Sequence, residues 1–251
     1  MQIVIPMAGA GSRFASAGYE RPKPFIEVNG KTMIQRVIEN LRVNDAKYVL
    51  IAQRAHLEEY GQELMSLMGD YDIVLVPIDH LTEGTACTVL AAEHVLDNAS
   101  PMFIANSDQL IDGGIGAMIA DARSKSLSGS IMCFNEPNRD PKWSYARLDE
   151  STALVTEVRE KQAISSLATV GVYYFSKAED FFVFARQMIE EDDRVNGEFY
   201  TCPVYNYAIK ADRRIGVFEI SRSWMHGLGT PADLRKYLKY FGQQYLSRGA
   251  D

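Results

Sequence analysis

Four short runs in the first half of the chain carry apolar residues at consecutive positions rather than at alternate ones. They are IVIPMA from Ile3, YVLIAQ from Tyr48, IVLVPI from Ile73 and MFIAN from Met102. Strands have this composition when both faces of their sheet are covered. Between them, apolar residues recur at helical spacing over 33–41, 57–67 and 85–96. Strands that alternate with helices predict a doubly wound, three-layer α/β/α sheet of Rossmann-like type with right-handed crossovers.

After about Gly129 the strands follow one another more closely. They are SIMCF, ARLD, LVTEV and ATVGVYYF, followed by helices from Ala178 and Thr201, the strand IGVFEI and an amphipathic helix after Pro231. Neither a repeat nor a Pro/Ser-rich linker separates the two halves. We therefore expect one domain over 1–251 with a mixed sheet, in which 129–251 forms a smaller lobe continuous with 1–128.

Composition excludes several classes of partner. A formal net charge of -7 argues against nucleic acid, because binding to a phosphate backbone needs a cationic surface. No apolar run approaches the ~20 residues that span a bilayer, and the first residues lack a basic leader, so we expect a cytoplasmic protein with no membrane contact. Cys87, Cys133 and Cys202 form no C-x-x-C pair, and we expect them to be reduced thiols in or near the core.

The segment IPMAGAGSRFASAGYERPKPF, from Ile5, follows the first predicted strand directly. Its glycines allow backbone N–H groups to approach an anion closely, at the sheet edge where open α/β sheets bind ligands. Arg13, Arg21 and Lys23 add positive charge around the same glycines. Phosphate is the expected ligand.

Two familiar phosphate motifs do not fit this segment. A dinucleotide fingerprint needs a third glycine where Phe14 stands and an uninterrupted helix where Pro22 and Pro24 stand. A Walker loop ending at Gly30-Lys31-Thr32 needs a glycine where Phe25 stands. An ordinary glycine turn with solvated charges remains an alternative.

The segment does resemble one family, the sugar-phosphate nucleotidyltransferases, whose signature is a strand, A-G-x-G-x-R-[FL] and then a P-K pair. AGAGSRF from Ala8 and PKP from Pro22 match both halves in order. The resemblance implies a GT-A-like fold in the short form without a C-terminal β-helix. The sequence IPMAGAGSRF, from Ile5, is similar to the corresponding segment of capsule and surface-polysaccharide cytidylyltransferases.

Further segments match the family pattern in order. EGTA from Glu83 is similar to a helix start that packs against the nucleobase, NSD from Asn106 to a metal-binding motif, and EK from Glu160 to an acceptor-binding pair. The resemblance implies nucleotide binding by Ala8, Gly9, Ala10, Gly11, Ser12, Arg13, Gly84, Thr85 and Asn106. It implies acceptor binding by Glu160, Lys161, Gly171, Glu198 and Tyr200.

The chemistry of phosphoryl-type transfer fits these roles, since it depends mainly on positioning and on neutralising charge. Arg13 and Lys23 are expected to hold the triphosphate and Lys161 the attacking phosphate, which makes these three the candidate catalytic residues. Asp108 is the expected ligand of Mg²⁺. Segment 1–128 is thus the nucleotide-binding half, and 129–251 the acceptor-binding half.

One late motif departs from the family. Members carry W-x-D-x-G-T, with the Asp as a second metal ligand, but this chain has WMHGLGT from Trp224, which puts Gly227 in the place of the Asp. Either His226 takes that role, which favours Mn²⁺ over Mg²⁺, or Asp108 acts with phosphates and water alone.

Asp79 bears on the choice of base. It lies five residues before Gly84, where uracil- and thymine-binding members often have glutamine. An ionised carboxylate only accepts hydrogen bonds, which suits the amino groups of cytosine or guanine. The sequence therefore favours CTP or GTP.

The expected function is transfer of a nucleoside monophosphate from a nucleoside triphosphate to a phosphorylated small molecule, with release of pyrophosphate. Trp143, Tyr145 and Tyr200 are expected to line the acceptor pocket, which suits a sugar ring or an amino-alcohol. A GT-A glycosyltransferase is less compatible, because Asn106 breaks its D-x-D motif. A non-catalytic nucleotide sensor remains an alternative. The oligomeric state stays open, a homodimer included.

Overall fold

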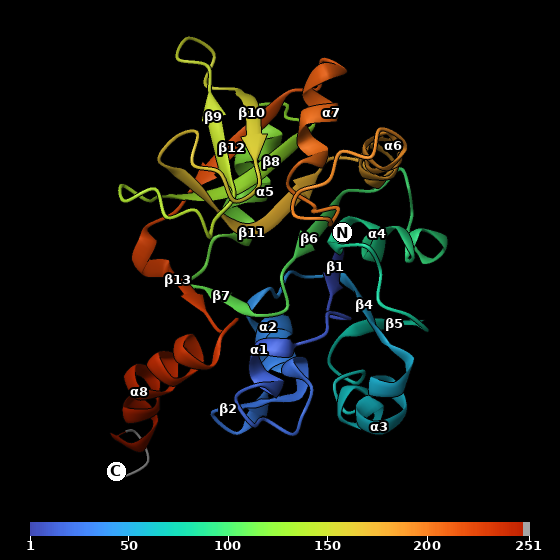
Figure 1. Ribbon diagram of the computed structural model, residues 1–251, viewed down its shortest axis with the longest axis vertical. Coiled ribbons are helices and arrows are strands. Elements are labelled where there is room, and N and C mark those ends of the chain that lie inside the picture. Colours follow the sequence, from blue (N-terminus) through green and yellow to red (C-terminus); the bar gives the residue numbers. More distant parts are fainter. Residues whose placement is uncertain (248–251) are drawn as a thin grey trace.

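In the computed structural model, which describes residues 1–247, strand β1 (Gln2–Pro6) lies inside a nine-stranded mixed sheet. The order across the sheet is β10-β9-β11-β6-β1-β4-β5, and β8 joins β11 and carries β12 on its other side (Figure 1). The other strands of this sheet are β4 (Lys47–Gln53), β5 (Asp72–Ile78), β6 (Met102–Ala105), β8 (Gly129–Asn135), β9 (Tyr145–Leu148), β10 (Val155–Arg159), β11 (Leu167–Phe175) and β12 (Ile215–Glu219).

Two short ribbons lie outside this sheet, and helices cover it. The ribbons pair β2 (Glu27–Val28) with β3 (Lys31–Thr32), and β7 (Gln109–Ile111) with β13 (Met225–Gly227). The α-helices are α1 (Ser12–Ala15), α2 (Met33–Asn40), α3 (Arg54–Met65), α4 (Thr85–Leu90), α5 (Ile115–Ser124), α6 (Ala178–Glu190), α7 (Val204–Lys210) and α8 (Pro231–Ser247). Single 3₁₀ turns are η1 (Lys23–Phe25), η2 (Glu93–Val95) and η3 (Arg222–Trp224).

The direction of winding reverses at β1. Strand β1 pairs in parallel with β4 on one side and with β6 on the other, so that Ile3 lies opposite both Tyr48 and Phe103. Strand β11 then joins β6 antiparallel, which makes the sheet mixed. In open α/β sheets, a ligand crevice forms outside the carboxyl ends of the strands at such a reversal. The segments after β1 and β6 therefore border the same crevice.

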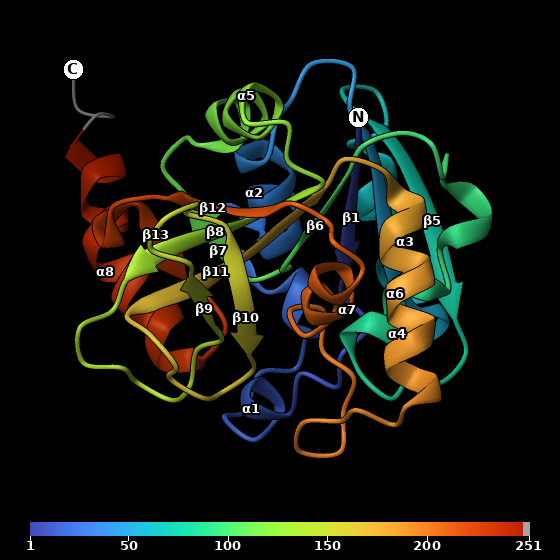
Figure 2. The same cartoon turned by 90° about the horizontal axis from the view of Figure 1, so that it is seen from above.

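The consecutive apolar residues of β1 contact different helix layers. Ile3 and Ile5 belong to one buried cluster with α2 and α5, whereas Val4 belongs to a second cluster with α4 and α6. Helices α4 and α6 lie side by side on their face of the sheet (Figure 2). The three-layer arrangement predicted from the unbroken apolar runs is thus confirmed.

Two details differ from or complete the sequence-based expectations. The helix expected over 85–96 is divided, because the amides of Ala91 and Ala92 bond three residues back and the chain turns before η2. The three cysteines are free thiols, with Cys133 and Cys202 buried and Cys87 partly exposed.

Among residues 1–247, no helix has both the length and the apolar character needed to cross a bilayer.

Gly84 provides a test of this packing. Its φ is +133°, and a Cβ there would lie 2.3 Å from the carbonyl oxygen of Phe199. We expect Gly84→Ala to lower the free energy of unfolding by about 2 to 5 kcal/mol, from backbone strain and overpacking together. Gly18, at φ +81° with no atom within 4 Å of the place that a Cβ would take, is the control, and Gly18→Ala should cost about 1 kcal/mol. Urea denaturation measures both, and equal losses would contradict the close approach to Phe199.

Candidate active site

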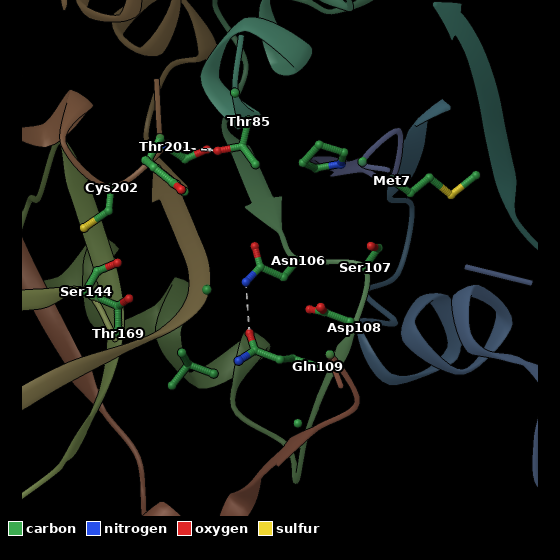
Figure 3. Close-up of a pocket in the computed structure, with 18 of the residues that line it drawn as sticks. Met7, Thr85, Asn106, Ser107, Asp108, Gln109, Ser144, Thr169, Thr201 and Cys202 are labelled. Carbon is green, nitrogen blue, oxygen red and sulfur yellow. Dashed lines mark hydrogen bonds between the residues drawn. The ribbon is translucent and has the colours of Figure 1, made fainter. Parts of the chain in front are cut away.

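A cavity of about 580 Å³ opens at the carboxyl ends of β1 and β6. Its walls come from the segment after β1, the start of α4, the β7–β13 ribbon, β11 and the segment before α7. Asn106, Ser107 and Asp108 lie on one side, and Ser144 and Thr169 lie across from them (Figure 3). The reversal at β1 therefore brings together residues that are far apart in the sequence.

The glycine segment forms the wall next to β1. Ala8, Gly9, Ala10 and Arg13 line the cavity, and Arg13 forms no ion pair within the part of the chain that the structure describes. The segment is fixed at its start by Gln53, whose side-chain amide donates to the carbonyl of Ala8 at 2.9 Å.

The end of the glycine segment turns away from the cavity into helix α1. Gly11 has φ +61° and caps α1, and the amide of Phe14 donates to its carbonyl at 2.9 Å. Gly11 and Ser12, expected to bind nucleotide, are not among the residues that line the cavity. They turn the backbone so that Arg13 faces the cavity while Phe14 enters the core, where it is 1% exposed.

Lys23 and Asp108 form an ion pair inside the cavity. The Lys23 ammonium lies 2.8 Å from Oδ2 of Asp108, and the two side chains are 24% and 21% exposed. Lys23 opens the turn η1, which is anchored by the buried ring of Phe25 stacked on Tyr60. Arg21 lies outside the cavity and pairs with Glu63.

The backbone around Asp108 is held from two sides. The amide of Asn106 donates to the carbonyl of Gly171 at 3.0 Å, and the amide of Leu228 donates to the carbonyl of Asp108 at 2.7 Å. A Cβ on Gly171 would lie 2.2 Å from Nδ2 of Asn106, and one on Gly229 would lie 2.7 Å from Oδ2 of Asp108. A Cβ at either glycine would force the side chain of Asn106 or Asp108 to move.

Asp108 is the carboxylate that best fits a divalent metal. Mg²⁺ usually keeps several waters and is held by one or two carboxylates together with substrate phosphates, which matches an aspartate beside a segment that is expected to bind phosphate. His226 does not face Asp108. It alternates in β13 with the cavity-lining Met225 and Gly227, and its Nε2 lies 2.9 Å from Oδ2 of Asp112. Within residues 1–247, no three His, Cys, Asp or Glu side chains group as a preformed metal site.

The wall expected to meet the nucleobase contains Gly84 and Thr85 together with Leu81 and Thr82. Asp79 does not belong to it. Its side chain is 61% exposed outside the cavity and accepts a hydrogen bond from Nε of Arg54, which holds the pKa of that carboxyl below its usual range.

The opposite wall is acidic and aromatic. Glu160, Gly171, Glu198 and Tyr200 line it as expected. Burial raises the pKa of Glu160, although the hydroxyl of Ser144 donates to this carboxylate and opposes the shift.

Lys161 and Tyr145 lie elsewhere than expected. Lys161 is outside the cavity wall, in the left-handed region with φ +55°, and its ammonium lies 4.4 Å from the ring centre of Tyr200, to whose hydroxyl it donates. Trp143 and Tyr200 reach the cavity, but the prediction that Tyr145 lines it is wrong. Tyr145 is fully buried in the core, and its hydroxyl donates to the carbonyl of Asp140 at 2.7 Å.

The sequence did not mark several residues that line the cavity. Gln109 accepts from the side-chain amide of Asn106 at 3.2 Å, Ser144 contacts Glu160, and Arg222 packs its guanidinium 4.8 Å from the ring centre of Phe134. Gln109 immediately follows the NSD segment, and Ser144 lies between Trp143 and Tyr145, in a segment expected to line the acceptor pocket. Arg222 reaches the cavity only through the folding of distant segments.

Comparison with known proteins matches residues 3–241 to the family model described as Nucleotidyl transferase. The chain is similar to a mannose-1-phosphate guanylyltransferase catalytic subunit beta of Dictyostelium discoideum, with 27% identity over 70% of this chain and 50% of that protein. It therefore spans about half the length of that relative. It is also similar to the UTP–glucose-1-phosphate uridylyltransferase AglF of Haloferax volcanii, with 23% identity over 93% of each chain.

Solved structures share the fold. A nucleoside-diphosphate-sugar pyrophosphorylase from Vibrio cholerae RC9 superposes with a TM-score of 0.83 at 25% identity, covering 94% of this chain and 99% of that one. An inositol-1-phosphate CTP transferase from T. maritima gives a TM-score of 0.74 at 16% identity, covering 94% and 93% of the two chains. With the family model matched over nearly its whole length, this chain belongs to the nucleotidyl transferase family.

Proposed function

We propose that this protein transfers a nucleoside monophosphate from a nucleoside triphosphate to the phosphate of a small phosphorylated acceptor. The observation that carries the proposal is a single cavity that joins the glycine segment after β1, the Lys23–Asp108 pair and the wall around Glu160. Such a cavity offers one place for a triphosphate and another for an acceptor, with charged groups between them.

The residues suit an in-line displacement. The backbone of Gly9 and Ala10 and the guanidinium of Arg13 hold the β- and γ-phosphates, and Lys23 neutralises the α-phosphate. Asp108 would hold Mg²⁺ or Mn²⁺, and the cation would supply positive charge that offsets the charge of the phosphates. An acceptor phosphate oxygen forms a bond to the α-phosphorus while the bond to the bridging oxygen of the β-phosphate breaks, and pyrophosphate leaves. The attacking phosphate is already anionic, so no general base is required.

The acceptor occupies the acidic wall. Glu160 and Glu198 can accept hydrogen bonds from hydroxyl or amino groups, and Gly171 leaves room at the floor beside Asn106. Lys161 reaches the acceptor phosphate when its ammonium gives up the hydrogen bond to the hydroxyl of Tyr200, a residue that itself lines the cavity.

The finer assignment is a cytidylyl- or guanylyltransferase that makes a precursor of surface polysaccharide in the cytoplasm. The opening segment supports this assignment through its similarity to such proteins. The related proteins carry names that specify guanylyl, uridylyl and cytidylyl transfer. A panel of nucleotides against sugar 1-phosphates and amino-alcohol phosphates tests base and acceptor together.

Lys23→Ala tests the transferase directly. We expect acceptor-dependent pyrophosphate release to fall by about 10²- to 10³-fold, because the mutation removes a charge aimed at the reacting phosphates. Lys31→Ala is the matched control, since Lys31 is an exposed lysine outside the cavity that pairs with Glu39. Equal activity in the two variants would refute the proposed role of Lys23.

Glu160→Gln separates a functional carboxylate from a structural one. Burial raises the pKa of Glu160, so its ionisation costs folded-state stability as the pH rises through that pKa. At pH 7 the neutral amide should therefore leave the thermal midpoint unchanged or higher, while the KM for the acceptor rises about 10-fold or more. Glu157→Gln is the control, because Glu157 pairs with Arg147 outside the cavity. A lower midpoint with an unchanged KM would make Glu160 structural.

Base preference should survive Asp79→Gln. In this structure the Asp79 carboxylate is engaged by Arg54 and lies outside the cavity wall. We expect the ratio of kcat/KM values for CTP, GTP and UTP to change less than about twofold, which corresponds to roughly 0.4 kcal/mol. A larger change would return Asp79 to the role that the sequence suggested.

A further inference from the structure

The segment 192–200 contributes Glu198 to the cavity wall by way of a tight turn. Val195 and Glu198 exchange two backbone hydrogen bonds of 3.0 Å each. Asn196 and Gly197, between them, have φ of +51° and +81°. Two successive left-handed residues are typical of the type I′ turn that closes a two-residue hairpin. Glu198 is therefore the last residue of the turn, and its place in the wall depends on how the turn is held.

The side chain of Arg194 connects this turn to a segment from the first half of the chain. Its guanidinium forms ion pairs with both Glu83 and Asp192. Its Nη1 also donates to the carbonyl of Gly197 at 3.2 Å. Its Cζ lies 4.1 Å from the ring centre of Phe199, which is 1% exposed. One guanidinium thus contacts the chain before the turn, inside it and after it.

Resting on the proposed function, we propose that Arg194 is a positioning residue that holds Glu198 in place for the acceptor. Arg194 is not among the residues that line the cavity, so it acts through the turn rather than on the substrate. Its partner Glu83 directly precedes Gly84 and Thr85, which line the wall expected to meet the nucleobase. The ion pair therefore links the acceptor wall to the nucleobase wall.

Backbone hydrogen bonds fix the chain after the turn but not the turn itself. The amide of Phe199 donates to the carbonyl of Glu83 at 2.8 Å. The side chains of Thr85 and Thr201 are hydrogen-bonded at 3.2 Å (Figure 3). Within the part of the chain that the structure describes, every hydrogen bond of 195–198 stays inside 192–200. The turn is therefore joined to Glu83 by the side chain of Arg194 and by the covalent chain through Phe199.

The contacts of Arg194 matter more for position than for stability. Its side chain is 32% exposed, and that of Glu83 is 64% exposed. Ion pairs this exposed contribute little to the free energy of unfolding, because water screens them. A displacement of about 1 Å at a substrate-contacting group, by contrast, lowers turnover by as much as about 10²-fold. Loss of the Arg194 contacts should therefore weaken acceptor use and leave the fold intact.

Arg194→Gln tests the proposal by a comparison of two affinities. Pyrophosphate release is followed with CTP or GTP and with glucose 1-phosphate, mannose 1-phosphate or phosphocholine, and the KM for the acceptor should rise about 10-fold or more. The Kd of CTP or GTP in Mg²⁺, measured by calorimetry, should change less than about twofold, because the backbone bonds between 83–86 and 199–201 remain. The thermal midpoint should fall by less than about 4 °C.

Further variants identify the contacts that matter. Glu83→Gln breaks the same ion pair from its other end, and combined with Arg194→Gln it should cause no further loss. Arg194→Lys should recover part of the acceptor affinity, because an ammonium keeps a charge for Glu83 without the forked geometry of the guanidinium. Arg186→Gln is the matched control, since Arg186 pairs with Glu93 outside the cavity wall and its side chain is 50% exposed.

Hydrogen exchange tests the same contacts without an acceptor. In Arg194→Gln, the amides of Val195 and Glu198, which bond across the turn, should exchange about threefold faster or more than in the wild-type protein. The amides of α6 should be unchanged. In Arg186→Gln, the exchange of Val195 and Glu198 should match that of the wild-type protein.

The outcomes separate this proposal from the proposed function. Unchanged acceptor KM and unchanged exchange in Arg194→Gln would overturn the proposal and leave the proposed function intact. Equal losses of acceptor and nucleotide affinity, together with a larger fall in thermal midpoint, would make Arg194 structural. Additive losses in the double variant would remove the role of Glu83. If the wild-type protein releases no pyrophosphate with any acceptor, the proposed function fails, and the acceptor role of Arg194 fails with it even where the exchange data show that Arg194 holds the turn.

Discussion

The parallel pairing of β1 with both β4 and β6 is the constraint on which the candidate site depends. Because the winding reverses there, the segments after β1 and β6 leave the sheet at the same edge and border one crevice. Lys23 of the first segment thereby contacts Asp108 of the second, which lies 85 residues later in the chain. The antiparallel strand β11 then closes the far side and supplies the floor at Gly171.

Close approaches at three glycines turn this crevice into a defined site. Gly84 lies against the backbone of Phe199, Gly171 against the side chain of Asn106 and Gly229 against the side chain of Asp108. All three contacts join a segment of the first half to one of the second. The two halves are therefore fastened together at the cavity itself, and small shifts there would change both walls at once.

The elements were predictable because their signals are local. Consecutive apolar residues identify the buried strands, and glycines with Arg13 identify the segment after β1 that lines the cavity. Side-chain direction was not predictable where it depends on register or on a distant partner. His226 alternates away from the cavity in a three-residue strand, and Asp79 is engaged by Arg54, 25 residues earlier. Tyr145 points into the core because β9 pairs with β11, which no spacing in the sequence reveals.

Charged side chains of both signs line the cavity. Arg13 and Lys23 stand on the side of β1, whereas Glu160 and Glu198 stand across from them. Burial raises the pKa of Glu160, so keeping it ionised opposes folding, and a purely structural role would be served better by a neutral side chain. A chain with a net charge of -7 attracts no anion in general. Gathering Arg13, Lys23, Lys142 and Arg222 around one cavity, together with Glu160 and Glu198, suits a ligand that carries both an anionic group and hydrogen-bond donors.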